Sequence, residues 1–179
     1  MSSDLPAVPF LTPDRPGTGG RIKVEPPDFE VEELSAYEPS GAGDHLFLWV
    51  EKTDLGAEFF VRQVARRPGI PNGEVGTAGL KDRRAVTRQM VSVPARAEPR
   101  LSELAGDGIR LLQVSRHGNK LRPGHLRGNR FRILVRGAEA TADRASLRRN
   151  GLRTLAGSPR SIAIPSVAVS PPRPNRWGP

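Results

Sequence analysis

The sequence of 179 residues contains no cysteine. This absence excludes a disulfide framework, a thiolate metal site and a cysteine nucleophile. The three histidines, His45, His117 and His125, lack the spacing of metal ligands, so we expect structural or solvent-exposed roles for them and no metal. No apolar run approaches the roughly 20 residues of a membrane-spanning helix, and the N-terminus lacks the pattern of a signal peptide. We therefore expect a cytoplasmic protein with no membrane partner.

Acidic residues are scarce in the part of the chain where basic residues are common. Residues 1–60 contain 4 basic and 12 acidic side chains, whereas residues 81–136 contain 14 basic and 4 acidic ones, within a formal net charge of +9. A concentration of cations in one segment is typical of proteins that bind a phosphate backbone. The charge distribution therefore predicts an anionic partner.

The length fits one ordinary domain, or part of a larger one. Residues 1–20 are rich in proline and glycine without periodicity, which predicts a flexible lead. Residues 21–157 carry the periodic patterns of a folded domain. Residues 158–179 are rich in proline, serine and arginine, which predicts a divergent or disordered tail.

Alternating and apolar segments predict a series of strands. The expected strands are residues 21–25, 29–34, 45–52, 75–80, 89–93, 109–114 and 131–135. The apolar run at 45–52 suits a central strand that is buried on both faces. Apolar spacing predicts a helix at 57–67, with Phe59 and Phe60 in the core, and a second helix at 138–155. Strands in series with few helices indicate an α+β domain built on an antiparallel sheet.

One stretch, residues 76–89, places the single carboxylate of Asp82 among the cations Lys81, Arg83, Arg84 and Arg88. An ionised carboxylate in a basic cleft suits a nucleophile that acts on a polyanion. The alternative is an ordinary connection from a strand to a turn, in which Asp82 caps the turn and the arginines are solvated.

Residues 78–89 resemble the active-site signature of the TruD family of tRNA pseudouridine synthases. Residues 23–33 and 41–52 are similar to the first motif of that family, and residues 115–131 resemble a third block in the same order. The resemblance covers roughly residues 20–137. It implies a pseudouridine synthase catalytic domain with a mixed, mostly antiparallel sheet and flanking helices. It also implies isomerisation of a specific uridine in tRNA, uridine 13, without a cofactor or metal. A non-catalytic basic RNA-binding module is the alternative.

The resemblance assigns roles to individual residues. Asp82 corresponds to the catalytic aspartate, acting either as a nucleophile or as a base. Lys23, Asn129 and Phe131 fall on positions near the active site. Phe131 is either a stacking partner for a flipped base or a core aromatic, and Lys23 either steadies the carboxylate or is an exposed strand lysine. The cations expected to bind RNA are Lys81, Arg83, Arg84, Arg88, Arg116, Lys120, Arg122, Arg127 and Arg130, unless the segment 116–130 is only a solvated hairpin connection.

The chain departs from the family pattern after Gly157, where further family motifs do not follow. We therefore expect an incomplete domain that binds tRNA but turns over poorly. An uncovered sheet edge and core face also predict a tendency to self-associate.

Overall fold

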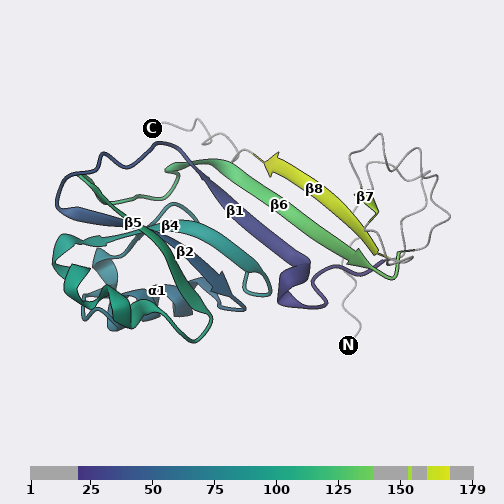
Figure 1. Ribbon diagram of the computed structural model, residues 1–179, viewed down its shortest axis with the longest axis horizontal. Helices are drawn as coiled ribbons and strands as arrows, with labels where there is room; N and C mark the ends of the chain where they lie inside the picture. The colour runs from purple at the N-terminus through teal and green to yellow at the C-terminus, as the bar shows by residue number, and fades with distance from the viewer. Residues whose placement is uncertain (1–19, 139–152, 155–160, 170–179) are drawn as a thin grey trace, which may run out of the picture.

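The computed structural model describes residues 20–138, 153–154 and 161–169. These residues form one eight-stranded sheet with the order β5-β2-β4-β1-β6-β8-β7, and β3 pairs with β4 beside this path (Figure 1). The strands are β1 (Phe29–Ser35), β2 (His45–Thr53), β3 (Gly76–Thr77), β4 (Val86–Pro94), β5 (Ile109–His117), β6 (Leu126–Arg136), β7 (Arg153–Thr154) and β8 (Ser161–Val169). The helices are α1 (Ala57–Arg66) and the 3₁₀ segments η1 (Pro26–Asp28), η2 (Asn72–Glu74) and η3 (Ala95–Leu104).

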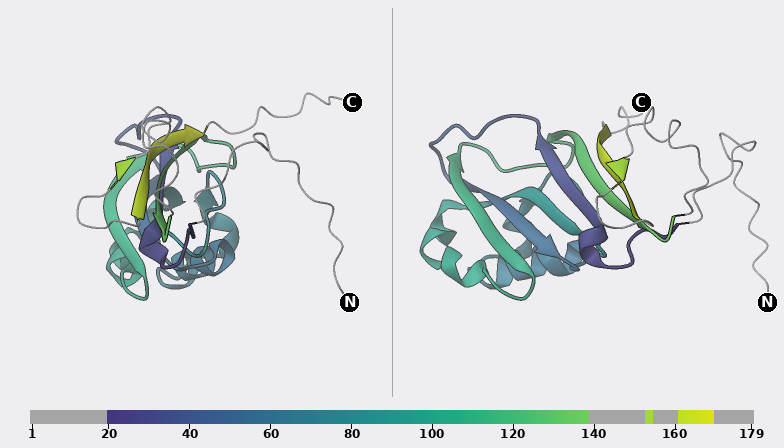
Figure 2. Two further views of the ribbon diagram at one scale, coloured as in Figure 1. Left: turned by 90° about the vertical axis from the view of Figure 1, so that its right-hand side faces the viewer. Right: turned by 45° about the vertical axis from the view of Figure 1, so that its right-hand side comes forward.

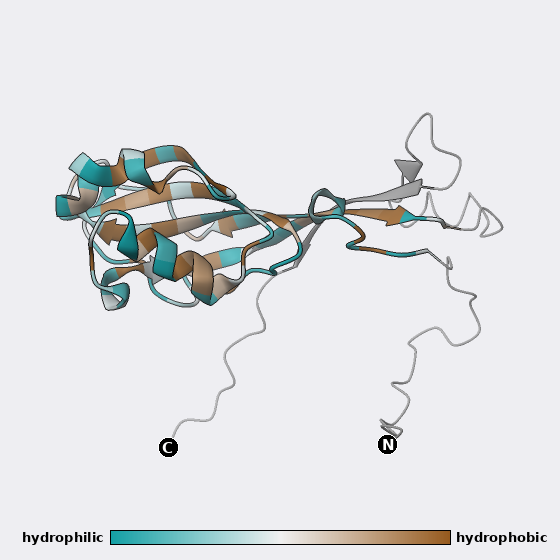
Figure 3. Cartoon of the chain, turned by 90° about the horizontal axis from the view of Figure 1, so that it is seen from below, coloured by the Kyte–Doolittle hydropathy of each residue, from teal (hydrophilic) through white to brown (hydrophobic). Residues whose placement is uncertain are grey.

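The sheet is mixed and mostly antiparallel, which confirms the predicted α+β class. Strands β1 and β4 pair in parallel, and the other pairings recorded among the described strands are antiparallel. Helix α1 lies along the half of the sheet formed by β2, β4 and β5, away from β6 and β8 (Figures 1 and 2). Apolar stretches, drawn in brown, run along the strands beside the helices (Figure 3).

The main core lies between this half of the sheet and helix α1. Leu46, Leu48 and Val50 of β2 are fully buried and belong to one cluster with Phe60 and Val64 of the helix. Because side chains alternate along a strand, these three β2 residues share one face. Burial along both faces of β2 confirms the prediction of an interior strand at residues 45–52.

A smaller aromatic cluster covers the opposite face of β2. Phe47 packs there with Tyr37 and His117, and the Tyr37 and His117 rings stack with centroids 5.3 Å apart. His125 Nδ1 forms a hydrogen bond with the Tyr37 hydroxyl at 2.8 Å. The structural role expected of His117 and His125 is thereby confirmed.

Several predicted elements differ from the structure near residue 21 and residue 76. The strand predicted at 21–25 is reduced to an isolated pairing of Arg21 with Arg136, because Lys23 adopts a positive φ of 56° and prolines begin η1. The strand predicted at 75–80 is only the two-residue β3, because the chain turns away toward Asp82. Strand β6 begins at Leu126 rather than at residue 131, which shortens the preceding connection.

The C-terminal predictions also need correction where the structure describes them. Most of the helix predicted at 138–155, residues 139–152, lies outside the described residues, but Arg153–Thr154 form strand β7. Within the predicted tail, Ser161–Val169 form strand β8, which pairs with β6. The alternating apolar residues of this segment suit a strand, and its proline concealed that pattern. The lead at 1–20, apart from Gly20, and the rest of the tail lie outside the described residues.

Candidate active site

The candidate site lies where strands β1 and β4 part. The two strands pair in parallel from Glu30 to Glu32 of β1. Further along β4, the short strand β3 pairs in place of β1. At the separation, Glu33 Oε1 accepts a hydrogen bond of 3.2 Å from the backbone N–H of Met90, so a carboxylate replaces the missing strand partner. The interrupted pairing lets the chain between β3 and β4 pass through the sheet.

Residues 78–85, which we call the Asp82 loop, cross from one face of the sheet to the other. At the start of the loop, Ala78 packs against Phe47. At Asp82 the backbone carbonyl accepts a hydrogen bond of 2.8 Å from Lys52 Nζ. Phe47 and Lys52 are an odd number of positions apart on β2, so their side chains point to opposite faces. Asp82 therefore lies on the Lys52 face of the sheet.

A buried ion pair fixes the middle of the loop. Lys81 Nζ lies 2.6 Å from Glu33 Oε2, and the two side chains are 3% and 1% exposed. The prediction that Lys81 contacts RNA is corrected by this geometry, because the ammonium is enclosed and already paired. Since Lys81 immediately precedes Asp82, the pair also fixes where the next residue leaves the sheet.

Asp82 itself is accessible and meets Lys23. Lys23 Nζ donates a hydrogen bond of 2.8 Å to Asp82 Oδ1, with the two side chains 30% and 47% exposed. The same ammonium lies 4.0 Å from the centroid of the Phe29 ring. Phe29 in turn packs against Phe131, with ring centroids 5.8 Å apart and planes inclined by 60°. The structure thus brings together three of the residues that the sequence assigned to the site: Lys23, Asp82 and Phe131.

The segment that carries Lys23 is held in place from two sides. Arg136 binds the buried carboxylate of Asp28 through two hydrogen bonds of 2.8 Å, and these bonds lower the pKa of Asp28 below its ordinary value. Arg84 Nη2 donates to the carbonyl of Val24 at 2.5 Å. Arg84, which the sequence assigned to RNA binding, therefore contacts the backbone beside Lys23 in this structure.

Lys52 is a component of the site that the sequence reasoning missed. Its buried ammonium donates to the Leu55 carbonyl at 2.6 Å as well as to that of Asp82. Burial lowers the pKa of Lys52 to about 8, with the charge of Asp82 opposing the shift and that of Lys81 adding to it. The signal was available, because Lys52 continues the inward series Leu46, Leu48 and Val50.

Polar groups without partners accompany the aspartate on this face. Within the described residues, Thr87 Oγ1, Gln89 Oε1 and Asn129 Oδ1 are buried and form no hydrogen bond. Asn129 lies opposite Glu33 in the β1–β6 register, and Thr87 lies opposite Lys52 in the β2–β4 register. Buried polar atoms are nearly always paired, so on this face the described residues leave hydrogen-bonding capacity unused.

The remaining predicted cations fall into two groups. Some are paired with carboxylates: Arg88 with Glu51 at 2.8 Å, Arg130 with Glu32 at 3.4 Å, Arg83 with Asp54 at 3.8 Å, and Arg116 with Glu98. Arg122 and Arg127 are exposed, and among the described residues no ion pair is recorded for either. The exposed pair is therefore freer to meet a phosphate.

Residues 118–125, which we call the basic loop, are attached to the Asp82 loop. The backbone N–H of Gly124 donates to the carbonyl of Ala78 at 2.8 Å, and that of Leu121 donates to Ser92 Oγ at 2.9 Å. Lys120 Nζ donates to the carbonyl of Gly73. The third sequence block thus contacts the start of the signature block.

No group of three or more histidine, aspartate or glutamate side chains with metal-binding geometry occurs among the described residues. Across the same part of the chain, no helix has the length and apolar character needed to cross a membrane.

Comparisons with known proteins identify similar sequences. A family model described as tRNA pseudouridine synthase D (TruD) matches residues 8–161. A relative from Anaeromyxobacter sp. (strain Fw109-5) named tRNA pseudouridine synthase D is 49% identical over 156 residues, covering 86% of this chain and 45% of its own length. One of the same name from Thermus thermophilus is 51% identical over 129 residues, covering 72% and 36%. The chain thus spans less than half the length of these relatives.

A solved structure gives the same result. A crystal structure from Methanosarcina mazei, described as tRNA pseudouridine synthase D (TruD), superposes with a TM-score of 0.67 and 29% sequence identity, covering 73% of this chain and 30% of that one. The mixed sheet, interrupted beside an accessible aspartate, defines an α+β domain of the pseudouridine synthase type. The chain belongs to the TruD family of tRNA pseudouridine synthases.

Proposed function

We propose that this chain carries the catalytic aspartate of a tRNA pseudouridine synthase, an isomerase that converts a specific uridine of tRNA, uridine 13, to pseudouridine. The contact of Lys23 Nζ with Asp82 Oδ1 at 2.8 Å carries the proposal. This contact places an accessible carboxylate beside a cation where the pairing of β1 and β4 is interrupted. The family model that matches the chain is described as tRNA pseudouridine synthase D. A tRNA substrate agrees with the cytoplasmic location expected from the sequence.

The reaction breaks the bond between N1 of uracil and C1′ of ribose, rotates the base and forms a bond from C1′ to C5. The proton lost from C5 balances the proton gained at N1. Asp82 serves either as a nucleophile toward the sugar or base, or as a base toward the sugar. Lys23 stabilises its negative charge while the nucleotide is displaced from its stack.

The rest of the site suits a flipped pyrimidine. Phe131 packs on Phe29, whose ring lies beneath the Lys23 ammonium. Phe131 is partly exposed, so its ring offers a surface for stacking. Asn129 Oδ1, which has no hydrogen-bond partner among the described residues, is an acceptor for the imino N–H of uracil. Lys52 and the Lys81–Glu33 pair hold the Asp82 loop in place. Catalytic groups must be positioned to within about 0.5 Å of their productive geometry.

The proposal is tested by replacing Asp82 with Asn in this chain and making the equivalent change in a full-length relative. We expect pseudouridine formation in tRNA transcripts to fall by at least about 10³-fold, because the carboxylate acts in the chemistry. Affinity for tRNA should stay within about threefold, because binding depends on the many phosphate contacts.

Conversion is measured by chemical labelling of pseudouridine, and affinity by filter binding. Arg66→Gln on the outer side of α1 is the matched control and should alter neither quantity. If the Asp82→Asn relative retains its activity, Asp82 is not the catalytic group. If neither unaltered protein converts uridine while both bind RNA, the chain is instead a non-catalytic RNA-binding module.

A further inference from the structure

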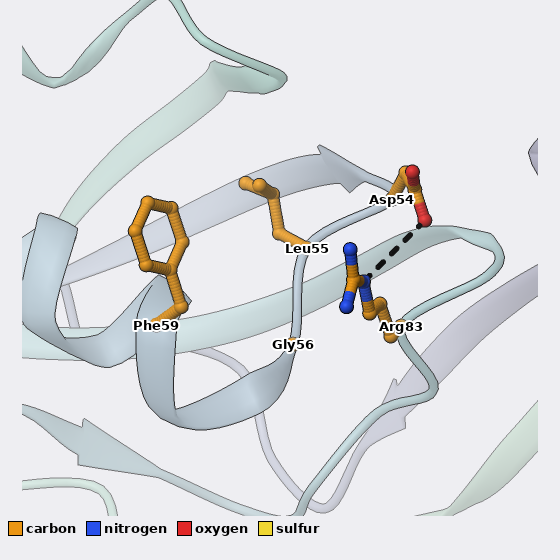
Figure 4. A pocket seen from close by; sticks show the side chains of 5 residues that line it. All are labelled: Asp54, Leu55, Gly56, Phe59 and Arg83. Carbon is orange, nitrogen blue, oxygen red and sulfur yellow. Dashed lines mark ion pairs between the residues drawn. The ribbon is translucent and has the colours of Figure 1, made fainter.

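A cavity lies beside the Asp82 loop and is not used by the chemistry described above. It has a volume of about 300 Å³ and is lined by Asp54, Leu55, Gly56, Phe59 and Arg83 (Figure 4). The lining residues come from the end of β2, the first turn of α1 and the Asp82 loop. Arg83 directly follows the proposed catalytic residue in the chain.

Phe59 is the unexpected member of this lining. The sequence predicts it in the core together with Phe60, but only Phe60 is buried there, and Phe59 is 43% exposed. The two residues are neighbours on a helix, so they point about 100° apart, and the core takes only one of them. The Phe59 ring is therefore presented to the cavity, and the prediction of a core role for it is wrong.

The cavity and the aspartate are fixed by the same side chain. Lys52 Nζ donates at once to the carbonyl of Leu55, which lines the cavity, and to that of Asp82. The backbone at Leu55, in the cavity lining, and the backbone at Asp82 are therefore within two hydrogen bonds of each other. In Figure 4 the Phe59 ring and the Arg83 guanidinium flank Leu55.

The chemistry of the lining matches one nucleotide of an RNA strand. The exposed face of Phe59 suits a stacked base, and the Arg62 guanidinium lies 6.0 Å from its centroid. Arg83 supplies a cation for the phosphate, because it is largely exposed and its nearest carboxylate, Asp54, is 3.8 Å away. Asp54 in turn offers an acceptor for a 2′-hydroxyl or an amino group, which favours RNA over an isolated anion.

We propose that this cavity, which we call the Phe59 pocket, binds the nucleotide next to the target uridine, with its base stacked on Phe59 and its phosphate on Arg83. The proposal rests on the proposed function, because it assigns a second position along the same RNA strand. It makes Phe59 a determinant of substrate position and not a catalytic residue.

The test is a double-mutant cycle in which tRNA affinity is measured after Phe59→Ala, after removal of one base from the RNA, and after both changes. The probe is a fluorescently labelled tRNA transcript, together with two versions in which the base on the 5′ or the 3′ side of the target uridine is replaced by an abasic site. We expect Phe59→Ala to weaken binding of the intact transcript roughly 5- to 100-fold. On one of the two abasic transcripts, the same substitution should change affinity by less than about twofold.

Two control variants separate stacking from other effects. Phe59→Tyr keeps an aromatic face and should bind like the unaltered chain, whereas Arg66→Gln removes one charge elsewhere on α1 and should leave the coupling unchanged. Equal weakening by Phe59→Ala on all three transcripts, or none, overturns the Phe59 pocket while leaving the proposed function in place. If the unaltered chain binds no tRNA, both proposals fail together.

Discussion

The Asp82 loop and the basic loop are both rich in cations, but they use positive charge in different ways. In the Asp82 loop, Lys81 is buried against Glu33, and Arg84 donates to a backbone carbonyl. In the basic loop Arg122 is exposed, and Arg127 is exposed just beyond it. Cations beside the aspartate therefore mainly determine the shape of the site, whereas Arg122 and Arg127 are available to a polyanion.

We expect the largest change in the free energy of unfolding on disrupting the buried Lys81–Glu33 pair. Lys81→Met leaves the Glu33 carboxylate buried without its cation, which costs about 3–5 kcal/mol in the free energy of unfolding. Urea denaturation followed by circular dichroism measures the loss. Arg83→Met, in the same loop but exposed, should change the free energy of unfolding by less than about 0.5 kcal/mol.

If Lys81→Met does not fold, a double variant tests the same prediction. In Lys81→Met combined with Glu33→Gln, no unpaired charge is buried and the amide oxygen still accepts the Met90 N–H. The double variant should therefore be more stable than Lys81→Met alone. Equal stability of the unaltered chain and Lys81→Met would mean that Lys81 is not structural and belongs with the exposed cations.

The next largest effect is a pH-dependent contribution of Lys52 to the free energy of unfolding. Burial lowers the folded-state pKa of Lys52 to about 8 from an ordinary value of 10.5. Between these two values the unfolded chain binds more protons than the folded one, so stability rises with pH. Relative to Lys52→Met, the unaltered chain should gain about 2 kcal/mol in the free energy of unfolding between pH 7.5 and 9.5.

The measurement compares the two proteins by urea denaturation at each pH, so that groups common to both cancel. Below pH 7 the difference between them should be constant, because Lys52 is then charged in both the folded and the unfolded states. A difference that does not change between pH 7.5 and 9.5 would show that the ammonium is solvated and does not hold the Asp82 loop as described.

Much of the fold followed from local pattern. Alternation along β1, the apolar run of β2 and the helical spacing of α1 each predicted an element that the structure contains. The failures arose where a tertiary partner overrides local preference. Residues 21–25 lost their strand character to the positive φ of Lys23. Strand β8 pairs with β6 despite the proline that conceals its alternating pattern.

The site was predicted in part for a similar reason. The resemblance assigned Asp82, Lys23 and Phe131 to the site. In the structure Lys23 contacts Asp82, and Phe131 is linked to Lys23 through the ring of Phe29. The number of cations in a segment does not show which of them is buried, as Lys81 is. The burial of Lys81 depends on where β1 and β4 separate. Lys52 was overlooked although it continues the inward series of β2, because the backbone carbonyls that accept its hydrogen bonds cannot be identified from residue type.

The smallest expected effect is on the salt dependence of tRNA affinity, and it concerns the exposed cations Arg122 and Arg127. Each phosphate contact that is lost lowers the slope of log affinity against log salt by about 0.7–0.9. If Arg122 and Arg127 each meet one phosphate, the variant Arg122→Gln/Arg127→Gln should bind tRNA with a slope smaller by about 1.4–1.8. Its affinity near 0.15 M salt should fall only modestly, because other contacts remain.

The control carries the same change in net charge at sites where the cations are already engaged. Arg96 pairs with Glu74 and Arg100 with Glu103 on η3, so Arg96→Gln/Arg100→Gln should leave the slope within about 0.3 of the unaltered value. Filter binding between 50 and 300 mM salt supplies both slopes. Equal slopes for the two double variants would show that the basic loop does not contact the RNA backbone and that the binding surface lies elsewhere on the chain. A smaller slope for the first variant alone assigns phosphate contacts to Arg122 and Arg127, because the two variants differ in the location of the lost charge and not in its amount.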